Sequence, residues 1–108
     1  MPHQIKPENW HSLSLAEQLG NIGSEVERVI SWQKKQKPDY AEKAMERALE
    51  LLDLSLANKN IKLPERQELA RVREALCCWF YGQNDYGMTD NFWHKYFLYF
   101  GILARSLR

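Results

Sequence analysis

The segment from Leu15 to Val29 carries the pattern that most limits how this chain can fold. Its apolar side chains recur in steps of four and three, at Leu15, Leu19, Ile22, Val26 and Val29. An α-helix has 3.6 residues per turn, so these steps place all five side chains on one face. The pattern predicts a helix whose apolar stripe faces a partner helix.

Local signals mark both ends of this helix. Ser14 is followed three residues later by Glu17, and this spacing is typical of a capping box at a helix start. The lysines of "SWQKKQK" suit the negative end of the helix dipole, and Pro38 ends the segment. We therefore expect a helix over about 14–37.

Three further segments carry helix signals. Asp39, with Glu42 three residues later, predicts the start of a helix over about 39–57. Pro64 suits the first turn of a third helix over about 64–81, and Gly82 is expected to end it in a left-handed conformation. A fourth helix, rich in aromatic residues, is expected over about 89–107.

The expected helices define a fold class. No segment shows the alternation of a β-strand, and the connections are short enough to favour antiparallel neighbours. The sequence therefore predicts an all-α protein, an antiparallel up-and-down four-helix bundle. Its 108 residues are expected to form a single domain, 1–108, with an N-terminal extension at 1–13.

Two glycines lie inside the first expected helix. Gly20 and Gly23 are unfavourable in a helix unless something requires them. Close packing against a ring such as Trp79 or Phe100 is one explanation, and a kink or a ligand groove is the other.

Composition excludes several classes of function. Fifteen basic and fourteen acidic residues leave a net charge of +1, which argues against nucleic acid as a partner. No apolar run approaches the roughly 20 residues of a membrane-spanning helix, so no membrane partner is expected.

Cys77 and Cys78 are adjacent and cannot form an unstrained disulfide on a helix, and the N-terminus lacks an apolar signal region. These features predict a cytoplasmic protein.

The stretch "CCWFYGQNDYGMTDNFWHKYF" at 77–97 is the candidate site. One interpretation is an ordinary packed turn between the third and fourth helices, with glycine and asparagine building the turn. The alternative is a ligand-binding pocket, in which Asp90 orients His94 from four residues away. The candidate ligand-binding residues are Asn84, Tyr86, Asp90, Trp93 and His94.

The sequence lacks the residue patterns that a catalytic site or a metal site would need. No nucleophile accompanies His94, so no catalytic residue is assigned and a non-catalytic protein is favoured over an enzyme. His3, His11 and His94 are scattered without metal-ligand spacing, so neither a metal nor another cofactor is expected. Asp53 and Arg73 either form a buried ion pair or both reach solvent beside the apolar stripes.

The fourth expected helix is apolar on more than one face. Trp93, Phe97, Phe100 and Ala104 trace one stripe, and the interface candidates Phe92, Tyr96, Tyr99 and Leu103 trace another. One stripe can fill the interior, while the other requires a different cover. We therefore expect an interaction module, a homodimer or one that pairs with a protein partner.

Two alternatives of other classes stay open. The 81–94 corner could bind a small ligand or a nucleotide. RNA binding would use "KKQK" and Arg105 with Arg108, but these cations lie at helix ends, where they complement the helix dipole in any case.

The segments "LSLAEQLGNIGSEVERVISW", "AMERALELLDLSL", "REALCCWFYG" and "WHKYFLYFGILAR" together resemble small prokaryotic four-helix proteins of uncharacterised function. More distantly, they are similar to HEPN-type bundles. Active HEPN ribonucleases carry an arginine four to six residues before a histidine. The nearest arginine before His94 is Arg73, so this hallmark is absent. The resemblance implies a partner-binding or nucleotide-proximal bundle without ribonuclease activity.

Overall fold

A computed structural model describes residues 6–106, which form five α-helices and no strand. The helices are α1 (Pro7–His11), α2 (Leu15–Lys34), α3 (Pro38–Leu56), α4 (Leu63–Tyr81) and α5 (Asp90–Ser106). The prediction of an all-helical protein is confirmed for this part of the chain. The four long helices match the four expected segments to within a few residues.

Some predictions concern residues outside the described range. The expected end of the last helix at 107, the first five residues of the N-terminal extension, His3 and Arg108 all lie there. The described part of the extension contains α1, a helix that the sequence analysis did not predict.

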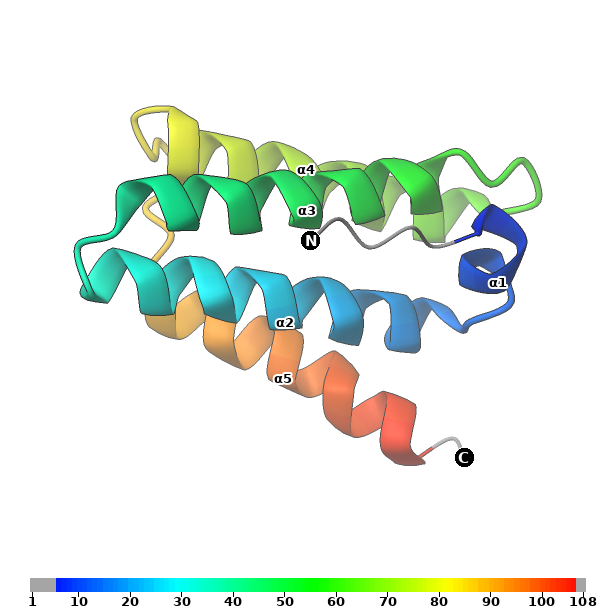
Figure 1. Cartoon of the computed structure of the whole chain (residues 1–108). Coiled ribbons are helices and arrows are strands. Elements are labelled where there is room, and N and C mark those ends of the chain that lie inside the picture. Colours follow the sequence, from blue (N-terminus) through cyan, green and yellow to red (C-terminus); the bar gives the residue numbers. More distant parts are fainter. Residues whose placement is uncertain (1–5, 107–108) are drawn as a thin grey trace.

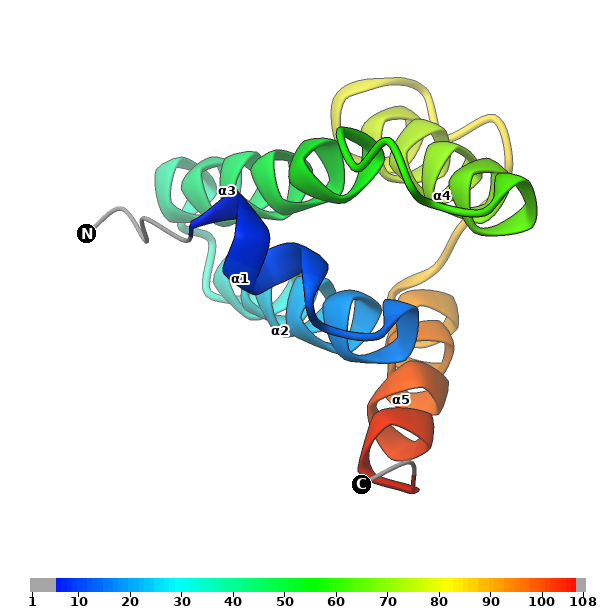
Figure 2. The same ribbon diagram turned by 90° about the vertical axis from the view of Figure 1, so that its right-hand side faces the viewer.

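The long helices are arranged around α2. α3 packs along one side of α2, α5 packs along another side, and α4 lies on α3 (Figure 1). The backbones of α4 and α5 do not approach each other closely along their lengths, and the view in Figure 2 shows them apart. α5 is therefore supported mainly by α2 and reaches α4 through long side chains.

The interior follows the predicted stripes. Four of the five predicted α2 positions, all except Leu15, are fully buried, as are Ala44, Met45, Ala48 and Leu52 of α3. The alanines let α3 approach α2 closely, because their side chains add little thickness to the helix. The apolar pattern of the sequence thus identifies the shared interior of α2 and α3.

The two predicted helix starts had different outcomes. The capping box is confirmed: the Glu17 backbone N–H donates to Ser14 Oγ at 3.1 Å, and the Ser14 N–H donates to Glu17 Oε1 at 2.9 Å. The prediction that Asp39 caps the next helix is wrong, because α3 already begins at Pro38 and its cap residue is Lys37. Asp39 instead lies in the first turn, where its charge suits the helix dipole.

Gly82 ends α4, but for a different reason from the predicted one. Its φ is −102°, so it is not left-handed. A Cβ atom at this position would lie 2.9 Å from the backbone oxygen of Cys78, which is too close for a backbone contact. Glycine is needed here for steric room and not for a positive φ.

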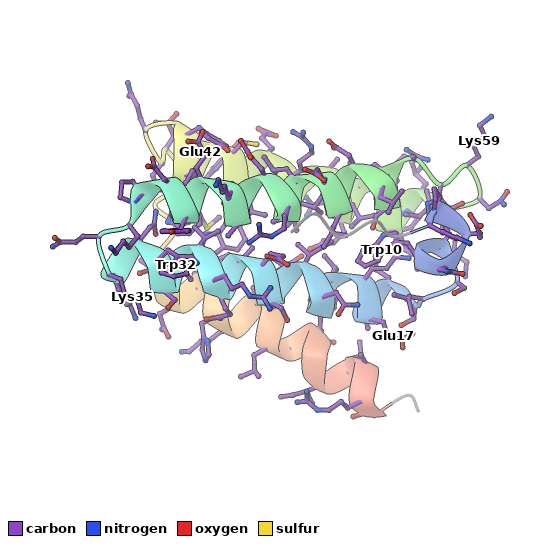
Figure 3. The ribbon with its side chains drawn as sticks, viewed as in Figure 1. Trp10, Glu17, Trp32, Lys35, Glu42 and Lys59 are labelled. Atoms are coloured by element: carbon purple, nitrogen blue, oxygen red, sulfur yellow. The ribbon has the colours of Figure 1, made fainter. Side chains whose placement is uncertain are left out.

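A buried polar network attaches α1 to the long helices. Trp10 is 2% exposed, and its Nε1–H donates to Ser55 Oγ at 2.8 Å. The Ser55 hydroxyl donates to Gln18 Oε1 at 2.6 Å, and Gln18 Nε2 donates to the backbone oxygens of Trp10 and Leu13. Figure 3 shows Trp10 between α2 and α3 at the end that α1 covers. Every member of this network has a partner, as buried polar groups require.

Candidate functional site

The face of α5 that packs on α2 is defined by two glycines. A Cβ atom on Gly23 would lie 2.4 Å from Phe97 Cβ, so the ring of Phe97 occupies the space that a side chain would need. Gly20 lies opposite Gly101, where a Cβ would be 3.6 Å from the Gly101 Cα. The predicted close packing is confirmed, but the ring involved is Phe97 and not Trp79 or Phe100. Trp93, Phe97 and Ala104 are buried on this face.

The other side of α5 carries exposed apolar side chains. Phe92, Leu98, Tyr99 and Ile102 are 42%, 46%, 61% and 49% exposed, and we call these four residues the α5 apolar stripe. Of the predicted interface candidates, Phe92 and Tyr99 belong to it, whereas Tyr96 and Leu103 are half-buried. Leu98 and Ile102 were missed, although their spacing of four residues places both on one face.

After its first residue, the charged side chains of α5 are basic. Asp90 lies at its start, and the sequence contains no acidic residue after that position. Lys95 and Arg105 are exposed, and neither has an ion-pair partner among residues 6–106. The exposed side of α5 therefore combines apolar and basic groups.

Aromatic side chains connect α5 to α4. The rings of Trp79 and Trp93 are 5.9 Å apart, and the Tyr96 hydroxyl donates to Glu68 Oε2. Burial and then the hydrogen bond to Glu68 raise the pKa of Tyr96 well above its ordinary value. Trp93 Nε1 is a buried donor without a hydrogen-bond partner among the described residues.

The polar candidates of the corner have protein partners on different elements. The Asn84 side chain binds its own loop, accepting from the Met88 N–H and donating to the Met88 oxygen, both at 2.9 Å. The Tyr86 hydroxyl donates to Glu74 Oε2 at 2.8 Å, and this hydrogen bond raises the pKa of Tyr86. These contacts close the turn between α4 and α5.

His94 and Asp90 do not form the expected pair. His94 Nδ1 lies 2.8 Å from Glu27 Oε2 of α2, on the exposed surface where α2 and α5 meet. Asp90 begins α5, and the side chain that caps the helix is Thr89, whose Oγ1 accepts from the Phe92 N–H at 3.0 Å. Trp93 is buried, so the five candidate residues do not converge on one space.

Asp53 and Arg73 form an ion pair at the surface. Arg73 Nε lies 2.7 Å from Asp53 Oδ1, and the two side chains are 37% and 56% exposed. Both alternatives were thus partly right, because the two residues are paired and also reach solvent. An exposed pair of this kind adds little stability.

Metal ligands and membrane-spanning elements are not found in the described part of the chain. Residues 6–106 contain no group of three histidine, cysteine, aspartate or glutamate side chains that could hold a metal ion. None of the five helices is both long and apolar enough to cross a membrane.

Comparison with known proteins gives no assignment. The chain matches no protein-family model, and no significant match was found among curated proteins or solved structures. The similarity to HEPN-type bundles therefore stays a prediction from the sequence. The exposed surface of α5 is therefore the feature from which we infer a function.

Proposed function

We propose that this chain is a non-catalytic helical interaction module that associates with itself or with another protein through α5. Its framework is an antiparallel bundle of the four long helices. The observation that supports this proposal is the exposure of the α5 apolar stripe on a helix whose opposite face is already buried against α2.

The stripe is unusual for a surface helix of a monomer. In residues 6–106, four of the eight exposed large apolar side chains lie on α5. Contiguous apolar patches above a few hundred Å² typically mark interaction surfaces. Aromatic side chains such as Phe92 and Tyr99 are also enriched at the centres of interfaces.

We expect the wild-type protein to sediment as an oligomer at micromolar concentration, and Tyr99→Asp or Phe92→Asp to shift it toward the monomer. A carboxylate placed in an apolar contact has to be desolvated, so each substitution is expected to weaken association at least about 30-fold, or about 2 kcal/mol. Analytical ultracentrifugation over a concentration series measures this shift.

Leu63→Asp is the matched control. Leu63 is 65% exposed but lies at the start of α4, away from the stripe. The same chemical change there should leave the oligomer intact. A wild-type protein that stays monomeric throughout the micromolar range would disprove self-association.

The alternative function, a small-ligand or nucleotide site near the corner, has one observation in its favour. The unpaired N–H of Trp93 is a buried donor that an acceptor group of a ligand would satisfy. Such a ligand should shift tryptophan emission and raise the melting temperature, and Trp93→Phe should abolish both responses. Titration with the common nucleotides tests this expectation, and unchanged emission and melting temperature would count against it.

A further inference from the structure

The basic charge beside the α5 apolar stripe favours a cover that carries acidic groups. Lys95 lies three residues after Phe92 and four before Tyr99, so its ammonium group sits within the stripe. Two α5 helices paired in a register that places Lys95 opposite Lys95 would bring like charges together, and like charges repel. A surface that pairs with this helix should therefore offer carboxylates beside apolar groups.

This chain carries a surface of that kind on α3. Asp39, Glu42, Glu46 and Glu50 recur in steps of three and four, so they share one face of the helix, and all four are exposed. Figure 3 shows Glu42 near the start of α3. An apolar group accompanies these acids. It is the ring of Tyr81 at the end of α4, a residue that is 50% exposed.

Tyr81 lies beside the same carboxylates. Burial, followed by the charges of Glu42 and Glu46, raises the pKa of Tyr81. We call the set of Glu42, Glu46, Glu50 and Tyr81 the acidic face.

Two arginines near the acidic face are paired with other carboxylates. Arg47 is engaged on the α2 side, where its Nε lies 3.2 Å from Oε1 of the buried Glu25. Arg73 is paired with Asp53. Lys43 is the remaining basic residue of α3, so the acids outnumber the free cations on this helix.

The two surfaces match in size and lie apart on the molecule. Glu42 and Glu50 are about 12 Å apart along the axis of α3, and Lys95 and Arg105 are about 15 Å apart along α5, at 1.5 Å per residue. Figures 1 and 2 show the α3–α4 pair at one edge of the molecule and α5 at the opposite edge. One copy can therefore offer both surfaces at the same time.

We propose that copies of this chain associate head to tail, with the α5 apolar stripe and Lys95 of one copy on the acidic face of the next. This inference rests on the proposed self-association and specifies its geometry. Because the contact joins two different surfaces, it does not close after two copies and extends into a ring or a filament.

The test uses two variants, each with one damaged surface. Tyr99→Ser with Ile102→Ser damages the stripe, and Glu46→Lys with Glu50→Lys reverses the acidic face. Each variant alone is expected to be monomeric, whereas an equimolar mixture should form a 1:1 complex of twice the monomer mass. That complex uses the intact stripe of the second variant and the intact acidic face of the first. Sedimentation velocity measures all three samples, and circular dichroism checks that both variants are folded.

Matched controls and salt complete the test. Glu8→Lys with Glu65→Lys changes the net charge equally, in α1 and in the first turn of α4, at the opposite end of α4 from Tyr81, and this variant should associate like the wild type. Raising the ionic strength should weaken the wild-type oligomer, because salt screens exposed charge pairs.

The other outcomes separate this inference from the proposed function. If the Glu46→Lys/Glu50→Lys variant still self-associates, self-association stands and the head-to-tail contact is wrong. If the wild type is monomeric, self-association and the head-to-tail contact both fail. If the mixed variants stay monomeric while the wild type binds vesicles of equal parts phosphatidylserine and phosphatidylcholine, the apolar and basic side of α5 contacts a membrane surface instead, and the head-to-tail contact is overturned.

Discussion

Replacing Trp10 by alanine is expected to lower the free energy of unfolding by about 3–5 kcal/mol. Trp10 is almost fully buried, and its indole packs against the main core from α1. The substitution also removes the donor to Ser55 Oγ. Natural domains of this size are stable by about 5–15 kcal/mol, so the variant should lose a large fraction of its stability. Urea denaturation followed by far-UV circular dichroism measures the loss.

Ser55→Ala isolates the polar part of this effect. The Ser55 hydroxyl accepts from Trp10 and donates to Gln18, so its removal leaves a buried donor and a buried acceptor without a partner. Each unsatisfied group costs about 1–3 kcal/mol. Ser24→Ala is the control, because Ser24 is exposed and should change stability by less than about 0.5 kcal/mol. If the Trp10→Ala variant were as stable as the wild type, the packing of α1 against the core would be wrong.

Gly23→Ala is expected to destabilise the protein by about 1–3 kcal/mol, even though alanine favours a helix by about 1 kcal/mol over glycine. The new Cβ would lie 2.4 Å from Phe97 Cβ and 2.7 Å from its Cγ. These atoms are fixed close to the α5 backbone, so relief requires the whole of α5 to move away from α2. Thermal unfolding should therefore occur at a lower temperature. A displaced α5 should also change the oligomeric state, because the proposed contact surface is on that helix.

Gly20→Ala is the control, and it is expected to raise the stability of the protein instead of lowering it. Its Cβ would lie 3.6 Å from the Gly101 Cα, an ordinary van der Waals distance, so the helix-propensity gain of up to about 1 kcal/mol should be retained. Two glycines three residues apart on one helix would thus respond differently to the same substitution. If both variants were equally stable, the close contact between Gly23 and Phe97 would be wrong.

The candidate site was only partly predictable. Phe92 and Tyr99 were identified because a second apolar stripe on one helix can be read from spacing alone. The sequence does not show which side of α5 faces α2, since both stripes are apolar. The choice depends on the fit of Phe97 against Gly23. Tyr96 was expected at the interface but turns toward Glu68 of α4.

The His94 prediction illustrates a second limit. The four-residue spacing predicted Asp90 as the partner of His94. In the structure His94 contacts Glu27, which is 67 residues away in the chain. A local rule identifies partners on the same helix and contains no information about a carboxylate on a neighbouring helix.

The amino-acid sequence by itself determined the long helices, the capping box at Ser14 and the buried stripes of α2 and α3. These features depend on interactions between residues three or four positions apart, which spacing reveals. Only the tertiary structure decided that Trp10 belongs to the core and that α5 leaves its stripe exposed. Both outcomes depend on contacts between distant segments, such as the 45-residue separation of Trp10 and Ser55, and on the shapes that meet there.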